Sequence, residues 1–172
     1  MKRILALSLT ILILLLAIGP AGMAFAATTA DVSVTATPSY VAIADNTTTV
    51  AFGAVVASST SNTSTSYVGI TNTSSVQTDQ TIAVTTSNWT GGVEWTHDDT
   101  ATAGVDTAGL VSNRGGTWGT GDVIVKYASP NYIYENCPAT TDYDYGLSLV
   151  APTEFGDGVE KAITVRITAA AG

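Results

Sequence analysis

The chain has 172 residues, in which 6 Lys and Arg face 14 Asp and Glu, so its formal net charge is −8. Nucleic acids and anionic membranes are bound through basic patches, and this composition excludes both as partners. After residue 26, Thr, Ser, Val, Ala and Gly dominate and the runs of Leu, Glu and Lys that favour helices are missing. The composition therefore predicts an all-β protein.

Residues 1–26 have the pattern of a secretory signal peptide. Lys2 and Arg3 precede an apolar run from Ile4 to Ile18, and Ala24-Phe25-Ala26 fits a small-x-small cleavage site. The run is shorter than the roughly 20 apolar residues that a membrane span needs, although an uncleaved N-terminal anchor is the alternative. We expect an exported protein that has no membrane association after cleavage. Loss of Lys2 and Arg3 leaves four basic residues against 14 acidic ones, so residues 27–172 carry a net charge of −10.

The mature chain begins with segments in which apolar and polar residues alternate, as in strands with one buried face. Asp31–Thr37 is the first, ends at Pro38, and Tyr40–Ala44 continues it after a kink. This first segment is either an ordinary strand of its own sandwich or a strand donated to the open sheet edge of a second copy.

The middle of the chain contains further short segments with strand character, separated by turns rich in Gly, Ser, Thr and Asn. We expect strands at Val50–Val56, Ser66–Thr71 and Gln80–Thr86, and a hairpin that turns at Thr90-Gly91-Gly92. The segments Ala57–Thr65 and Asp98–Gly121 lack sustained alternation and are expected to be loops.

The C-terminal third supplies the clearest strand patterns. Asp122–Ala128 alternates, Asn131–Glu135 is expected to be an edge strand, and Asp142–Ala169 is expected to form a hairpin. In that hairpin the apolar faces are Tyr143, Tyr145, Leu147 and Leu149 in one strand and Ile163, Val165 and Ile167 in the other. The sequence predicts one antiparallel β-sandwich of about eight or nine strands, immunoglobulin-like or jelly-roll-like, over residues 27–172.

Two stretches add a resemblance to known proteins. Tyr67-Val-Gly-Ile-Thr-Asn-Thr-Ser-Ser-Val, followed by Thr81-Ile-Ala-Val, resembles the immunoglobulin-like domains of bacterial and archaeal surface proteins. The ending from Gly158 to Thr168 is similar to the last strand of secreted sandwich subunits of the TasA and camelysin type, which form filaments. The resemblance implies an extracellular sandwich that self-assembles, and it carries over no catalytic residue.

Calcium is the cofactor hypothesis that the sequence offers. Asp98, Asp99, Asp106 and Asp122 lie in or next to a Gly-rich segment, and Ca²⁺ takes six to eight oxygen ligands from carboxylates and carbonyls. The spacing does not match an EF-hand loop, and a solvated acidic loop is the alternative.

Three aromatic residues are candidates for a glycan-binding platform. Trp118 lies between Gly-rich segments, and Tyr132 and Tyr134 alternate in an expected edge strand. Burial in the core is the usual role of such residues, and Trp95 is expected to be part of the core. Four Asn-x-Ser/Thr sequons, at Asn46, Asn62, Asn72 and Asn88, would mark exposed loops in an organism with N-linked glycosylation.

His97 and Cys137 are each the only residue of their kind. His97 with Asp98 and Asp99 is the one grouping that resembles a hydrolase, but no Gly-x-Ser-x-Gly motif selects a nucleophile, and a surface His beside acids is the simpler interpretation. Cys137 cannot form an internal disulfide, so it is either a partly buried thiol or half of an intermolecular disulfide.

These observations favour a non-enzymatic structural or adhesive protein of the cell surface, a candidate fibre subunit. Its expected partners are other copies of itself or cell-surface components, including glycans. The alternatives are a calcium-dependent carbohydrate-binding module and, with less support, a secreted hydrolase.

Overall fold

The computed structural model describes residues 33, 35–127 and 129–172. The chain divides into two units, residues 1–37 and residues 38–172, and the fold below is that of the second unit. The predicted signal peptide lies outside the described residues, as do residues 31, 32 and 34 of the expected first strand. The described residues of that segment, 33 and 35–37, are exposed and belong to no strand.

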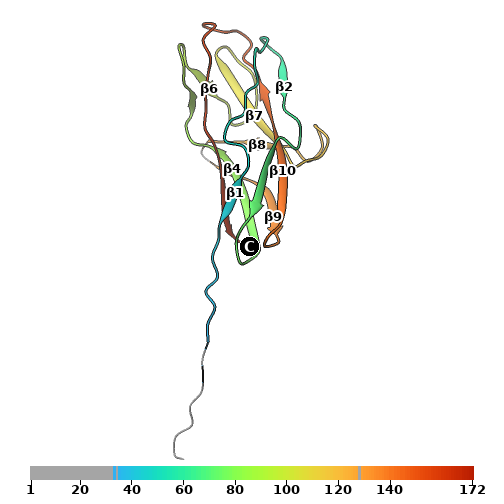
Figure 1. Ribbon diagram of the computed structural model, residues 1–172. Coiled ribbons are helices and arrows are strands. Elements are labelled where there is room, and N and C mark those ends of the chain that lie inside the picture. The colour runs from blue at the N-terminus through green and yellow to red at the C-terminus, as the bar shows by residue number, and fades with distance from the viewer. Residues whose placement is uncertain (1–32, 34, 128) are drawn as a thin grey trace, which may run out of the picture. The chain divides into compact units, whose positions relative to one another are not determined.

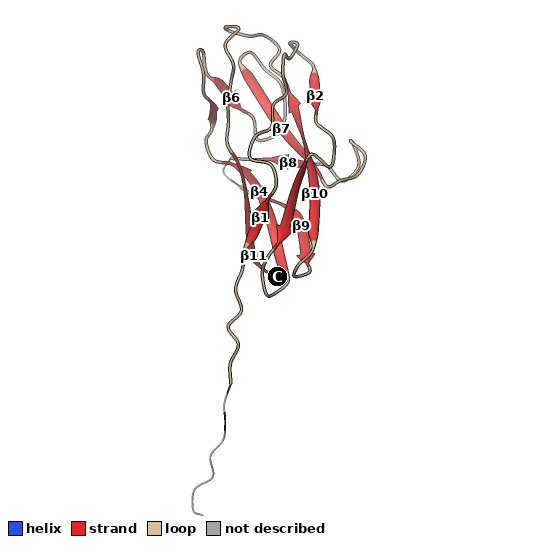
Figure 2. Ribbon diagram, viewed as in Figure 1, coloured by secondary structure: helices blue, strands red, loops and turns tan. Residues whose placement is uncertain are grey.

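All regular structure in the described residues consists of strands (Figures 1 and 2). None of these residues forms a helix long and apolar enough to cross a membrane. In chain order the strands are β1 (Ile43–Asp45), β2 (Thr60–Asn62), β3 (Val68–Asn72), β4 (Thr78–Val84), β5 (Asn88–Trp89), β6 (Trp95–His97), β7 (Thr107–Asn113), β8 (Val123–Val125), β9 (Asn131–Cys137), β10 (Asp142–Val150) and β11 (Val165–Ala171). The all-β prediction is confirmed, with 11 described strands where about eight or nine were expected.

β10 is the centre of the larger, eight-stranded sheet. One edge of β10 pairs with β3 over its first half and with β2 over its last three residues, and the other edge pairs with β7. β1 lies outside β3, and β8, β6 and β5 extend the sheet beyond β7. β6 pairs with β7 in parallel, whereas the other pairs named here are antiparallel.

The second sheet has three strands in the order β11-β4-β9. Ile82 of β4 and Ile133 of β9 are fully buried and belong to the same apolar core as Leu110 and Leu147 of the larger sheet. Two sheets that bury their facing side chains against each other are a β-sandwich. The predicted sandwich is therefore confirmed.

The alternation predicted for β10 is confirmed on its core side, where the odd-numbered residues from Tyr145 to Leu149 are buried. The opposite face, formed by the even-numbered residues, was expected to be exposed to solvent. It is exposed at Asp142 and Asp144 but buried at Gly146 and Ser148. The second half of β10, from Tyr145 to Leu149, is thus covered on both faces.

The cover over β10 depends on Gly146. A Cβ at this position would lie 2.4 Å from the carbonyl oxygen of Ser64 and 3.0 Å from a ring carbon of Trp118. The loop after β2 and the Trp118 ring occupy the space that a side chain would need, so glycine permits this close approach.

The C-terminal hairpin prediction is wrong. β10 belongs to the larger sheet, whereas β11 pairs with β4 in the smaller one, so residues 151–164 cross between the layers. The alternation in the last strand holds, because Ile163, Val165 and Ile167 are half-buried between exposed neighbours. A period of two identifies a strand and its buried face, but it does not name the strand that pairs with it.

The expected loop Asp98–Gly121 contains β7, a strand in the interior of the larger sheet. Ala108, Gly109 and Leu110 are all buried, so this strand has no alternation of apolar and polar residues to detect. Small residues are required there, since a Cβ at Gly109 would lie 2.4 Å from the Cα of Ala101. A strand covered on both faces loses its period-two signal.

Two further expectations fail in the segment before β3. Val50–Val56 is not a strand, because its chain turns at Gly53, which has a φ of 67°. Val50, Phe52 and Val55 nevertheless pack against the core while partly exposed. The expected loop Ala57–Thr65 contains the short strand β2, whose Thr-Ser-Asn sequence gives no apolar signal.

Candidate functional site: an apolar groove between the two sheets

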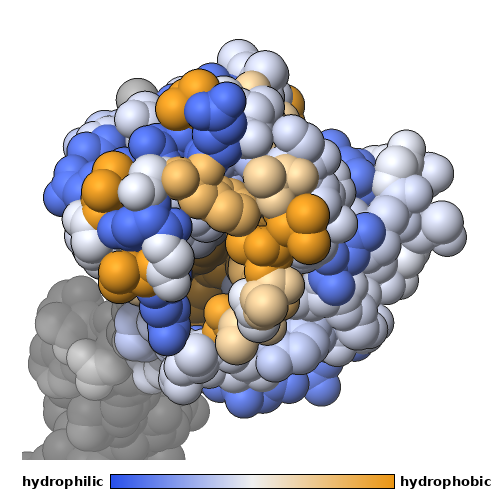
Figure 3. All heavy atoms as spheres, turned by 90° about the horizontal axis from the view of Figure 1, so that it is seen from above, coloured by the Kyte–Doolittle hydropathy of each residue, from blue (hydrophilic) through white to orange (hydrophobic). Residues whose placement is uncertain are grey.

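A cavity of about 1080 Å³ opens between the two sheets, and we call it the interlayer groove. Residues 47–55 form one wall and residues 157–167 the other. Figure 3 looks at the molecule from above and shows hydrophobic surface gathered around a hollow. The floor consists of core side chains from β3, β7 and β10: Val68, Ile70, Leu110, Tyr145, Leu147 and Leu149.

The groove lies between two sheet edges. Ile43 and Asp45 of β1, the outermost strand of the larger sheet, line it on one side, and Val165 and Ile167 of β11, the outermost strand of the smaller sheet, line it on the other. Within the described residues β1 pairs only with β3, and β11 pairs only with β4 among the named strands. The groove therefore combines apolar surface with backbone groups that a further strand could pair.

Three aromatic rings line the groove where it meets β5 and β6. The ring centroids of Trp89 and Trp95 are 6.0 Å apart, and Phe155 stacks on Trp95 at 5.4 Å. Both indoles are buried, with 5% and 6% exposure, and this confirms the core position predicted for Trp95. Their Nε1 donors have no hydrogen-bond partner within the described part of the chain. A buried donor of this kind is costly unless an acceptor meets it.

An ion pair fixes the wall that faces these rings. Lys161 Nζ contacts Asp157 Oδ1 and lies 5.9 Å from the Trp95 ring centroid. The Asp157 carboxylate also accepts hydrogen bonds from the backbone N–H groups of Val93 and Val159. The hydrogen bond from Lys161 and those backbone donors lower the pKa of Asp157 to about 2. The loop beside the groove is thus anchored to the turn between β5 and β6.

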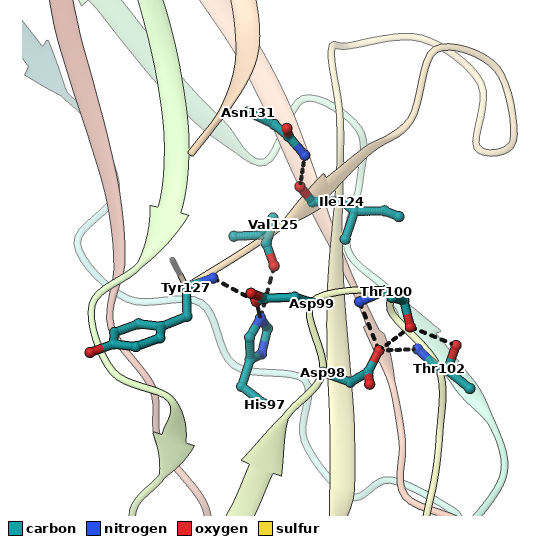
Figure 4. Close-up of polar contacts among 9 residues, drawn as sticks. All are labelled: His97, Asp98, Asp99, Thr100, Thr102, Ile124, Val125, Tyr127 and Asn131. Atoms are coloured by element: carbon teal, nitrogen blue, oxygen red, sulfur yellow. Dashed lines mark hydrogen bonds and ion pairs between the residues drawn. The ribbon is translucent and has the colours of Figure 1, made fainter. Parts of the chain in front are cut away.

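The surface position expected for His97 is wrong, since only 7% of the residue is exposed. Its Nε2 lies 2.8 Å from the carbonyl oxygen of Val125 and therefore donates to it, and Asp99 Oδ1 is 3.8 Å from the same nitrogen (Figure 4). Asp99 also accepts a hydrogen bond from the N–H of Tyr127 at 2.6 Å. These contacts connect the end of β6 to β8, and the imidazole is directed at backbone rather than at an open surface.

The four acidic residues of the calcium hypothesis make separate sets of hydrogen bonds. Figure 4 shows that Asp98 accepts hydrogen bonds from Thr100 and Thr102 in its own turn. These bonds lower the pKa of Asp98, and the one from the Thr100 hydroxyl has the largest effect. Asp106 accepts from the N–H of Gly156 at 2.6 Å.

Asp122, the fourth of these residues, bonds within the loop between β7 and β8. Its carboxylate accepts from the amide of Asn113 at 2.5 Å and from the N–H of Gly119 at 2.9 Å. Across the described ranges, no three His, Cys, Asp or Glu side chains are grouped so that they could hold a metal ion.

Trp118 and Tyr134 of the aromatic-platform hypothesis do not share one surface. Trp118 is half-buried, donates its indole N–H to the carbonyl oxygen of Thr63 at 3.3 Å and lies on the outer face of β10 at Gly146. Tyr134 contacts Tyr143 at a centroid distance of 4.5 Å, and residues 143 and 146 point to opposite faces of β10. Burial raises the pKa of Tyr134 to about 12. Tyr132 is 55% exposed.

Cys137 is more enclosed than the partly buried thiol that was expected, with no exposed surface. Burial raises the pKa of its thiol, which lowers the fraction of reactive thiolate. A bond to a second chain would require this end of β9 to open first.

The comparisons with known proteins leave the groove to be interpreted from its own geometry: no protein-family model matches the chain, and no curated protein or solved structure matches it significantly. Sequence reasoning missed the groove because its walls come from segments about 100 residues apart. The one signal in the sequence was the apolar content of Val50–Val56, part of which lines the groove. We interpreted that content as a strand.

Proposed function

We propose that the protein is a non-enzymatic structural or adhesive subunit of the cell surface, and that copies join when a strand of one copy enters the interlayer groove of the next. The observation that carries this proposal is the open groove of about 1080 Å³, whose floor is the hydrophobic core itself. The floor side chains are 1–6% exposed, whereas the walls carry partly or fully exposed apolar residues such as Phe52, Val159 and Ile163. Covering each Å² of such apolar surface is worth about 25 cal/mol.

An extended peptide fits this groove better than a compact ligand does. Its backbone can pair with the outer edge of β1 or β11, and alternate side chains can reach the apolar floor. The rings of Trp89, Trp95 and Phe155 line the same groove and add apolar surface at the end near β5 and β6.

The occupant that we propose is the Asp31–Thr37 segment of a second copy. Val32, Val34 and Ala36 form its apolar face, and Ser33 and Thr35 form its polar face. Its described residues, 33 and 35–37, are exposed and belong to no strand. Export of the chain, as predicted from residues 1–26, would place this segment at the new N-terminus.

Two double variants of the mature chain, residues 27–172, test the proposal. Val32→Asp with Val34→Asp places charges on the apolar face, and Ser33→Asp with Thr35→Asp places the same charges on the polar face. We expect the wild type and the polar-face variant to form oligomers or filaments, seen by size-exclusion chromatography and electron microscopy. The apolar-face variant should remain a folded monomer with a cooperative melting transition.

Two results would contradict strand donation. If the apolar-face variant loses cooperative unfolding, the segment belongs to its own sandwich. If the wild type is a stable monomer at high protein concentration, spontaneous assembly does not occur.

The alternative of a calcium-dependent carbohydrate-binding module has less support. It needs the carboxylates to converge and the aromatic side chains to share a face. In the described residues no three acidic side chains are grouped for a metal ion, and Trp118 and Tyr134 contact opposite faces of β10. A glycan array screened with the monomeric variant would test this alternative independently.

A further inference from the structure

The four Asn-x-Ser/Thr sequons occupy different environments. The Asn72 side chain is fully buried, and its Nδ2 donates to the carbonyl oxygens of Cys137 and Pro138 at 2.9 and 3.0 Å. Asn88 is half-buried and donates to Glu94 Oε2 at 2.9 Å. In both residues the nitrogen that would carry a glycan is already engaged.

The remaining two sequons lie at the surface. The Asn46 oxygen accepts from the N–H of Gly69 at 2.7 Å, and its Nδ2 would lie 2.5 Å from a Cβ at Gly69, so this amide packs flat on β3. Asn62 is exposed at the end of β2, and its side chain makes no hydrogen bond within the described part of the chain. Asn62 is therefore the sequon whose amide is most accessible.

We propose that Asn62 is a site of N-linked glycosylation, and that Asn72 is a structural residue despite its matching sequon. The co-reactant is a lipid-linked oligosaccharide. The Asn62 Nδ2 forms a bond to the anomeric carbon of the sugar, the bond from that carbon to the lipid phosphate breaks, and the nitrogen loses one proton as the lipid phosphate leaves. The third position of the sequon, Ser64, is also exposed, so both residues that the enzyme recognises are accessible.

The position of Asn62 gives such a glycan a physical role. β2 pairs with β10 on one edge, and its other edge pairs with no strand among the described residues. An open edge invites pairing with other chains, and natural proteins protect such edges. A bulky hydrophilic glycan at Asn62 would shield this edge while leaving the interlayer groove open. The proposal does not depend on strand donation, since it rests on the accessibility of the amide.

Glycopeptide mass spectrometry of the protein exported by its native cells tests this inference. We expect the peptide with Asn62 to carry a sugar mass and the peptide with Asn72 to be unmodified. Asn62→Gln, expressed in the same cells, should remove that mass and increase the mobility of the protein on a gel. Asn88→Gln is the matched control, and its mobility should stay close to that of the wild type. An unmodified Asn62 peptide in native material would overturn the proposal, and so would a glycan on Asn72 with Asn62 bare.

Discussion

The side-chain nitrogen of Asn72 donates a hydrogen bond to the carbonyl oxygen of Cys137 over 2.9 Å, and this bond joins β3 of the larger sheet to the end of β9 in the smaller sheet. The Asn72 oxygen accepts from the N–H of Ser74 at 3.0 Å, so both ends of the amide are used. A fully buried polar side chain thus holds the two layers together at the end opposite β2.

Replacing Asn72 with Ala should destabilise the sandwich. The carbonyl groups of Cys137 and Pro138 would lose their donor, and a buried polar group without a partner costs about 1–3 kcal/mol. We expect the urea midpoint of Asn72→Ala to fall with an unchanged m-value. Asn62→Ala is the matched control, because that side chain is exposed, and its stability in unglycosylated recombinant protein should change by no more than about 0.5 kcal/mol. Equal stability of the two variants would contradict this role for Asn72.

A side chain at residue 146 should also be costly. In Gly146→Ala the new methyl group would meet the backbone of Ser64 and Thr65 at 2.4 and 2.8 Å, and backbone cannot move aside as a flexible side chain can. Overpacking of this kind costs about 1–3 kcal/mol. Gly158→Ala, whose methyl group would have no neighbour within 4 Å, is the control and should melt like the wild type. Thermal melts of the two variants separate the effects.

The two-layer architecture was predictable because the longer strands other than β7 alternate in hydropathy. β11 shows this pattern clearly and its burial follows it, whereas in β10 burial follows it on the core side and both faces are buried from Tyr145 to Leu149. β7 was missed for the opposite reason, since Ala108, Gly109 and Leu110 are all covered and leave no contrast. Pairing partners also escaped prediction, because the register between β11 and β4 depends on residues about 85 positions apart.

The candidate site was harder to predict than the fold. Charge and aromatic content drew attention to Asp98, Asp99 and Trp118, but each of these residues is committed to hydrogen bonds with its neighbours. The groove has no chemical signature in the sequence, since its lining is ordinary core apolar residues. The groove arises from the way in which distant segments come together, and this is visible only in three dimensions.

Acid should weaken the ion pair beside the groove. The pKa of Asp157 is lowered to about 2 in the folded protein from 3.8, chiefly by Lys161. A carboxylate whose folded pKa is depressed adds stability above its unfolded pKa and loses it as the pH falls through the folded value. The stability difference between wild type and Asp157→Asn should therefore be full above about pH 4 and should decline toward pH 2.

Urea midpoints measured between pH 2 and pH 6 check this expectation. Glu135→Gln is the control, because Glu135 is exposed and is in no ion pair among the described residues, so its difference from the wild type should stay flat. A constant difference between wild type and Asp157→Asn over the whole range would show that the pair with Lys161 adds no pH-dependent stability.

Calcium should not change the stability of the folded protein. Asp98, Asp106 and Asp122 accept hydrogen bonds from separate backbone donors, and within the described residues no three acidic side chains are grouped so that they could hold a metal ion. A ligand that binds the folded state at a hundredfold excess over its Kd adds about 2.7 kcal/mol. We therefore expect equal melting temperatures in excess Ca²⁺ and in chelator. A rise with Ca²⁺ that disappears in Asp98→Asn would restore the calcium hypothesis.

The Cys137 thiol should be unreactive in the folded protein. It has no exposed surface, and burial raises its pKa, so a thiol reagent can reach it only when this end of β9 opens. We expect labelling in native buffer to be much slower than in denaturant, and a single monomer band on a non-reducing gel. The matched control is Cys137→Ser combined with Val56→Cys, which moves the thiol to a residue that is 71% exposed and should react at once. Rapid labelling of the native wild type, or a disulfide-linked dimer, would mean that Cys137 is available to a second chain.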